Sequence, residues 1–193
     1  MKNIYPLLLA MVVSFFSYSL SAQTIGVKTN LLYDATGTIN LGAEVKLAER
    51  WTLDIPVNYN PWRFSDNKQM KHALLQPEAR YWFCGTFNRH FLGAHLHGGM
   101  YNVGKMNLPS DWGHNSIEKF RYKGWLAGAG ISYGYHWILG NRWSLEASLG
   151  VGYAYLSYDK YELCENCMQQ VSDRTKHYFG PTKAAVSLIY IIR

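Results

Sequence analysis

The strongest pattern in the chain is an alternation of bulky and small residues between Trp125 and Trp137. A β-strand sends alternate side chains to opposite faces, so one face of this segment is apolar with aromatic residues at its ends. The other face carries mostly glycine and small or polar residues. A soluble β-sandwich would not need so much glycine there, whereas an outer-membrane barrel has lipid outside and a tight lumen inside. The segment therefore predicts a transmembrane strand.

Seven further segments alternate in the same way, each with a consistent parity of apolar positions. The eight segments lie near residues 25–33, 39–47, 51–60, 73–83, 92–100, 125–137, 143–155 and 183–192. Pro77 interrupts the fourth segment and requires a bulge or a locally unpaired position. An even count of about eight strands closes into the smallest outer-membrane barrel. We therefore predict an all-β fold, an eight-stranded antiparallel transmembrane up-and-down β-barrel.

The connections between these segments alternate in length. Short, turn-like links are expected at residues 48–50, 85–89 and 139–141, and long loops at residues 61–71, 105–119 and 159–178. Outer-membrane barrels have short periplasmic turns and longer extracellular loops. If the N-terminus of the barrel starts in the periplasm, all three short links are periplasmic and all three long loops lie outside the cell.

Residues 1–22 are expected to be a secretory signal peptide. They contain the early charge of Lys2, an apolar run over residues 7–16 and a small-residue end at 19–22. The apolar run is shorter than the roughly 20 residues of a spanning helix, and no later stretch is continuously apolar enough to form one. Cleavage after Ser21 and cleavage after Ala22 are both compatible with the sequence. Residues 23–193 are expected to form one outer-membrane β-barrel domain.

The net charge of +6 comes from basic residues that are scattered along the chain. A nucleic-acid surface would need them clustered. Attraction to anionic lipopolysaccharide fits the distribution better.

Charged residues fall on the inward parity of several segments and predict a charge network in the lumen. The set comprises Lys28, Glu44, Lys46, Asp54, Glu78, Arg80, Glu146 and Lys183. Charges in a narrow lumen must be paired or hydrated, because an isolated buried ion is very costly. Eight strands leave little space, so we expect a salt-bridged plug rather than a path for protons, ions or solutes.

Three histidines also fall on inward positions. His95 and His97 share one strand, and His136 lies on the next segment. They form a possible lumen histidine cluster, but their spacing matches no zinc pattern. We therefore expect lumen histidines whose ring nitrogens are hydrogen-bonded within the protein, with no metal and no cofactor.

A hydrolase triad can be imagined from His136, Glu146 and either Ser148 or Ser132. Small outer-membrane lipid A deacylases do use Ser and His on barrel walls, but where lipid reaches them. The present residues are expected to face the lumen, and no nucleophile elbow accompanies them. The sequence therefore favours a protein that is not an enzyme.

Cys164 and Cys167 form a CxxC in the last long loop, which suggests redox exchange, metal binding or a local disulfide. No second CxxC completes a tetrahedral site, so a small disulfide in an extracellular loop is the simplest interpretation. Cys84 is expected near the opposite end of the barrel, unpaired.

Four motifs carry a resemblance to a known family: KTNLLYD at 28–34, NPW at 60–62, QPEARYW at 76–82 and GGMY at 98–101. With them, the chain resembles a Bacteroidetes-type outer-membrane β-barrel family of unknown function, similar to OmpX or OmpA barrels. The resemblance implies an outer-membrane barrel, in some cases encoded near fimbrial or surface-assembly genes. It implies no reaction and transfers no catalytic residue, and it places Pro77 within the shared pattern.

The leading hypothesis is a small structural or interaction protein in the outer membrane of a Gram-negative bacterium. Its loops would contact lipopolysaccharide, partner proteins or fimbrial components. A narrow channel or transporter subunit is the first alternative, and a lipid-modifying hydrolase is the second. A soluble lipocalin-like barrel is the main alternative fold, and it predicts an apolar lumen.

Overall fold

The computed structural model describes residues 24–62, 69–104, 120–163 and 168–192. The proposed signal peptide and the Cys164–Cys167 pair lie outside these residues. The elements are β1 (Ile25–Asn30), α2 (Leu31–Ala35), β2 (Ile39–Ala48), β3 (Trp51–Asn60), β4 (Gln69–Leu75), β5 (Glu78–Trp82), β6 (Arg89–Gly104), β7 (Phe120–Ile138), β8 (Trp143–Leu163) and β9 (Met168–Ile192). No helix in the described part of the chain is long and apolar enough to cross a membrane.

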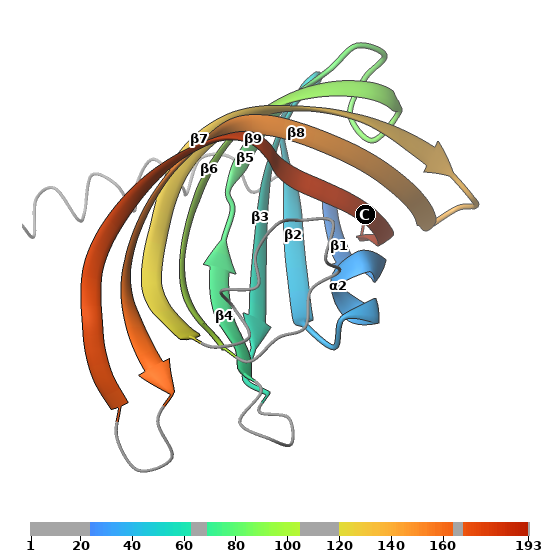
Figure 1. Ribbon diagram of the computed structural model, residues 1–193. Coiled ribbons are helices and arrows are strands. Elements are labelled where there is room, and N and C mark those ends of the chain that lie inside the picture. The colour runs from blue at the N-terminus through green and yellow to red at the C-terminus, as the bar shows by residue number, and fades with distance from the viewer. Residues whose placement is uncertain (1–23, 63–68, 105–119, 164–167, 193) are drawn as a thin grey trace, which may run out of the picture.

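The strands form one closed antiparallel barrel. Strands that follow one another in the chain pair, except β4 and β5, and β1 pairs with β9 to close the sheet. Strands β4 and β5 both lie between β3 and β6, so they occupy a single position and the barrel has eight strands. Figure 1 shows β7, β8 and β9 arching over the shorter strands, with α2 at the ends of β1 and β2. The predicted fold class, an eight-stranded antiparallel barrel, is confirmed.

The break between β4 and β5 falls at Gln76 and Pro77. Proline has no N–H to donate to a ladder, so a strand tolerates it only where pairing is interrupted. Here the carbonyl of Pro77 still accepts from the Leu96 N–H at 3.0 Å, and the Gln76 N–H donates to the Pro56 carbonyl at 3.2 Å. β4 and β5 therefore follow the same path along the barrel wall, and the ladder is interrupted only at the proline, as the sequence predicted.

Several boundaries differ from the prediction, including those of the first strand and of the last long loop. The first strand ends at Asn30 rather than near Tyr33, because the Asn30 side chain accepts from the Leu32 N–H and starts α2. The stretch 159–178, predicted as a loop, belongs largely to β8 and β9. These two strands pair from Trp143 and Tyr190 out to Leu163 and Met168.

The two ends of the barrel differ in their connections. At the turn end, β2 joins β3 through residues 49–50, β5 joins β6 through 83–88, and β7 joins β8 through 139–142. The loop end carries α2 and the outer parts of β6, β7, β8 and β9.

Alternation along the strands sorts side chains between the lumen and the outer surface. Large apolar residues are exposed on the outside, among them Leu41, Val57, Leu96, Ile131, Leu149 and Val151. The buried side chains of the lumen are mostly polar or charged. This polarity is the reverse of that in a soluble protein core.

Candidate functional site

The lumen holds a cluster of ion-paired side chains, here called the charge cluster. It comprises Lys28, Glu44, Asp54, Glu78, Arg80, Glu146 and Lys183. These residues come from β1, β2, β3, β5, β8 and β9. The structure thus brings together seven of the eight lumen charges predicted from parity.

Arg80 is the centre of the charge cluster. Its Nη1 lies 2.7 Å from Glu44 Oε2 and 2.9 Å from Glu146 Oε2. Its Nη2 lies 2.7 Å from Asp54 Oδ2, and its Nε lies 2.6 Å from Glu78 Oε1. A planar guanidinium presents its donors in a fixed fork, so one Arg can hold several carboxylates at once. Arg80 thereby ties β5 to β2, β3 and β8 across the lumen.

Two lysines complete the charge cluster from the other side. Lys28 Nζ lies 2.6 Å from Glu44 Oε2 and 3.0 Å from Asp54 Oδ2. Lys183 Nζ lies 2.7 Å from Glu78 Oε2. Every carboxylate in the set therefore has at least one cation within 3 Å, which is the condition under which buried charges persist.

Lys46 lies outside the charge cluster. It has the inward parity of Glu44, but it is two residues nearer the turn end and is only half-buried. It forms no ion pair with the described residues.

Aromatic and aliphatic side chains close the turn end beneath the charge cluster. This apolar plug consists of Trp82, Phe87, Phe91, Ile189 and Ile191. The Trp82 ring centroid lies 4.8 Å from that of Phe91 and 5.8 Å from that of Phe87. The Arg80 guanidinium carbon lies 4.4 Å from the Phe91 ring centroid, a cation–π contact that joins plug and cluster.

The sequence analysis did not predict the apolar plug, although strand parity places two of its rings on the inward face. Trp82 and Phe91 occupy inward positions of their strands. Phe87 lies in the β5–β6 turn with a φ of 59°, a left-handed conformation that is uncommon for a bulky residue. That conformation accompanies burial of the Phe87 ring in the lumen.

The three predicted histidines do not form one cluster. The His95 and His97 rings are 5.6 Å apart, and His95 Nε2 lies 3.0 Å from Thr182 Oγ1. His136 lies instead in the apolar plug, with its ring 5.6 Å from that of Trp82. The described residues contain no group of three His, Cys, Asp or Glu side chains that could hold a metal ion.

The imagined catalytic triad is not assembled either. His136 Nδ1 lies 3.8 Å from Glu146 Oε2, which is beyond hydrogen-bond distance. The hydroxyls of Ser132 and Ser148 have no hydrogen-bond partner among the described residues, so neither is bonded to an imidazole. A nucleophile and its general base must be within hydrogen-bond reach of one another.

Little space remains around the charge cluster. The cavity next to it, lined by Lys28, Asp54, Arg80 and Lys183 among others, has a volume of about 30 Å³. A cavity of that size holds about one or two water molecules. Together with the apolar plug below it, the charge cluster closes the lumen.

Fold and lumen together define a class: a small β-barrel whose lumen is closed by its own side chains. Residues 7–192 match the model of a family described as a protein of unknown function, DUF3575. The chain belongs to this family. Neither the curated proteins nor the solved structures give a match.

Proposed function

We propose that this protein is an outer-membrane β-barrel with a structural and interaction role, and that it acts through its loop end. One observation carries the proposal: seven charges are paired inside the lumen, while large apolar side chains cover the outside. A lipocalin-like soluble barrel has the opposite polarity. Lipid is the solvent that makes this distribution favourable.

Aromatic residues on the outer surface support a membrane setting. At the turn end, Trp51 packs against Tyr81 with ring centroids 5.3 Å apart, and Trp143 packs against Tyr190 at 5.0 Å. Nearer the loop end, Trp125 packs against Tyr155 at 5.6 Å. Two aromatic girdles separated by an aliphatic band are typical of outer-membrane barrels.

A closed lumen directs the proposed function to the loop end. A barrel whose lumen is closed by the charge cluster and the apolar plug offers macromolecular partners its rim and its outer surface. Lipopolysaccharide, partner proteins and fimbrial components remain the proposed contacts, in a Gram-negative outer membrane. The closed lumen disfavours the channel alternative. The hydrolase is disfavoured because, among the described residues, neither Ser132 nor Ser148 is hydrogen-bonded to His136.

Photo-crosslinking in intact cells tests this proposal. A photoreactive residue in place of Ala35, which is exposed on α2, is expected to form adducts with lipopolysaccharide or a surface protein. The same residue in place of Asn141, exposed in the β7–β8 turn, serves as the matched control and should not form those adducts. Adducts are identified by mobility on gels and by mass spectrometry.

Two results contradict the proposal. The first is recovery of the protein with soluble proteins rather than with the outer-membrane fraction. The second is an Ala35 variant whose adducts do not exceed those of irradiated wild type.

A further inference from the structure

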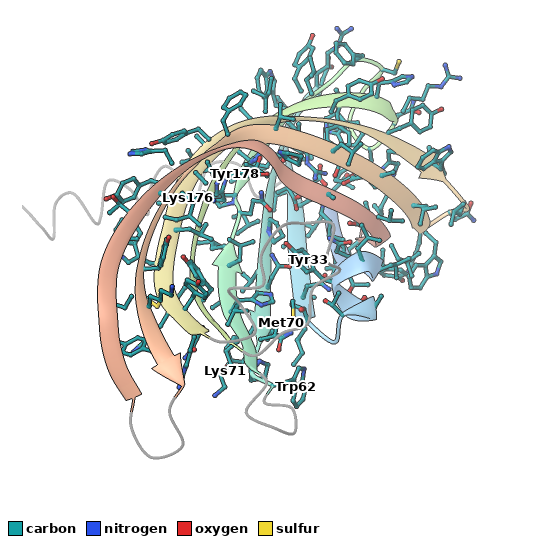
Figure 2. The ribbon with its side chains drawn as sticks, in the orientation of Figure 1. Tyr33, Trp62, Met70, Lys71, Lys176 and Tyr178 are labelled. Atoms are coloured by element: carbon teal, nitrogen blue, oxygen red, sulfur yellow. The ribbon has the colours of Figure 1, made fainter. Side chains whose placement is uncertain are left out.

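A second space, here called the vestibule, lies inside the barrel on the loop-end side of the charge cluster. It has a volume of about 320 Å³ and is lined mainly by Leu74, His97, Leu126, Leu156, Lys176 and Tyr178. Ligand pockets for small molecules begin at about this size. Figure 2 labels Tyr178 from β9, with Tyr33 from α2 and Met70 from β4 under the arch of β7 to β9.

The strand register explains why the vestibule exists. One inward row across β6, β7, β8 and β9 contains His97, Gly128, Ala154 and Tyr178. The next row toward the loop end contains Leu74, Gly99, Leu126, Leu156 and Lys176. The first row has the small residues Gly128 and Ala154 between His97 and Tyr178, and the second has Gly99 between Leu74 and Leu126. These small residues leave the space between the leucines and the tyrosine.

The vestibule differs in polarity from the rest of the lumen. Below it the inward positions are charged, whereas its own walls present three leucines and the Tyr178 ring. Barrel interiors in the outer membrane are usually polar. An apolar cavity with a few placed polar groups is instead the usual form of a ligand site.

Two polar groups mark the vestibule for an anionic ligand. Lys176 is exposed and forms no ion pair with any residue in the described ranges. His97 is only 6% exposed, and its Nδ1 has no hydrogen-bond partner in the described part of the chain. A buried polar atom without a partner is costly, so a ligand that bonds to the imidazole would relieve that cost.

We propose that the vestibule binds a single-chain anionic amphiphile. Its alkyl chain lies among Leu74, Leu126 and Leu156, and its anionic head group pairs with Lys176 and bonds to the His97 imidazole. The shared chemistry is an alkyl chain that ends in a carboxylate or a phosphate, whether it comes from a free fatty acid or from a lysophospholipid. This proposal goes beyond the interaction role above and holds whether or not the loop end contacts a surface partner.

Binding is tested with the full chain in lipid discs, using dansylamino-undecanoate as a fluorescent probe. Saturable fluorescence above that of protein-free discs is expected for wild type. Leu156→Trp fills the vestibule and should weaken binding at least about tenfold. Leu149→Trp, on the outer face of the same strand, is the matched control and should bind like wild type.

The head group is tested by displacement. Dodecanoate or lysophosphatidic acid of the same chain length should displace the probe, and the more potent of the two identifies the source. Dodecyltrimethylammonium should displace it about tenfold less well. Lys176→Glu should reverse that order, while Lys123→Glu, an exposed lysine on β7, should leave it unchanged.

Three results overturn the proposal: no saturable signal in wild type, equal binding by the Leu156→Trp variant, or equal displacement by the cationic and anionic amphiphiles. None of them bears on whether the protein lies in the outer membrane.

Discussion

Replacing Arg80 with methionine is expected to lower the free energy of unfolding by about 3–5 kcal/mol. Arg80 is 1% exposed and contacts Glu44, Asp54, Glu78 and Glu146. Without it, four buried carboxylates face two lysines. The uncompensated charges destabilise the folded barrel far more than the lost packing does, since methionine keeps much of the side-chain volume. Urea unfolding in detergent, followed by circular dichroism and gel mobility, measures the change.

Two further variants separate charge from packing. Arg50→Met, at an exposed arginine whose Nη1 donates to the Tyr81 hydroxyl, should leave the unfolding midpoint nearly unchanged. Adding Glu44→Gln and Glu146→Gln to Arg80→Met leaves two cations and two carboxylates, and should recover part of the stability. If this triple variant recovers nothing, or if Arg80→Met alone costs less than about 1 kcal/mol, the charge cluster does not hold the barrel together as described.

Replacing Trp82 with alanine is expected to lower the free energy of unfolding by about 3–5 kcal/mol. The Trp82 ring is fully buried and packs against Phe87, Phe91 and His136. Removing it opens a cavity that the closed barrel cannot fill by collapse, because strand pairing fixes the wall on every side. The same unfolding experiment reports the loss.

Trp82→Phe is the internal control for this prediction. It keeps most of the ring but removes the hydrogen bond from Trp82 Nε1 to Thr52 Oγ1, which is 2.9 Å long. Loss of that bond should cost about 1 kcal/mol. Equal effects of alanine and phenylalanine at this position would refute the view that ring packing closes the turn end.

Parity along the strands predicted the seven members of the charge cluster, together with Lys46, which lies outside it. Because the side-chain period of a strand is two, a consistent apolar face fixes the opposite face as well. Parity does not give the level of each residue along the barrel axis. Lys46 has the parity of Glu44 yet lies outside the charge cluster, and His136 has an inward position yet lies in the apolar plug rather than beside His95.

The length of β8 and β9 could not be read from apolar alternation. Beyond Tyr155 the outward positions become polar, with Ser157 and Asp159 in place of aliphatic residues. Backbone pairing with β7 and β9 nevertheless continues past this point. Alternation of apolar residues arises where the outer face of a strand contacts apolar surroundings. It therefore marks only that part of the strand and not its full length.

The inward glycines of β7 lie against rings of β6. In the structure, a side chain added at Gly134 would collide with the Phe91 ring, and one added at Gly128 or Gly130 would collide with His97 or His95. The glycines of β7 therefore make room for the rings of β6, and so serve the plug and the floor of the vestibule.

The central claim is that the charge cluster and the apolar plug close the lumen. Single-channel recording of the wild-type protein in planar lipid bilayers tests it most directly, with a porin of known conductance inserted in the same way to show that open channels are detected. We predict no current steps above those of the bare bilayer. Steady conductance steps whose number rises with the amount of protein would contradict the claim and restore the channel alternative.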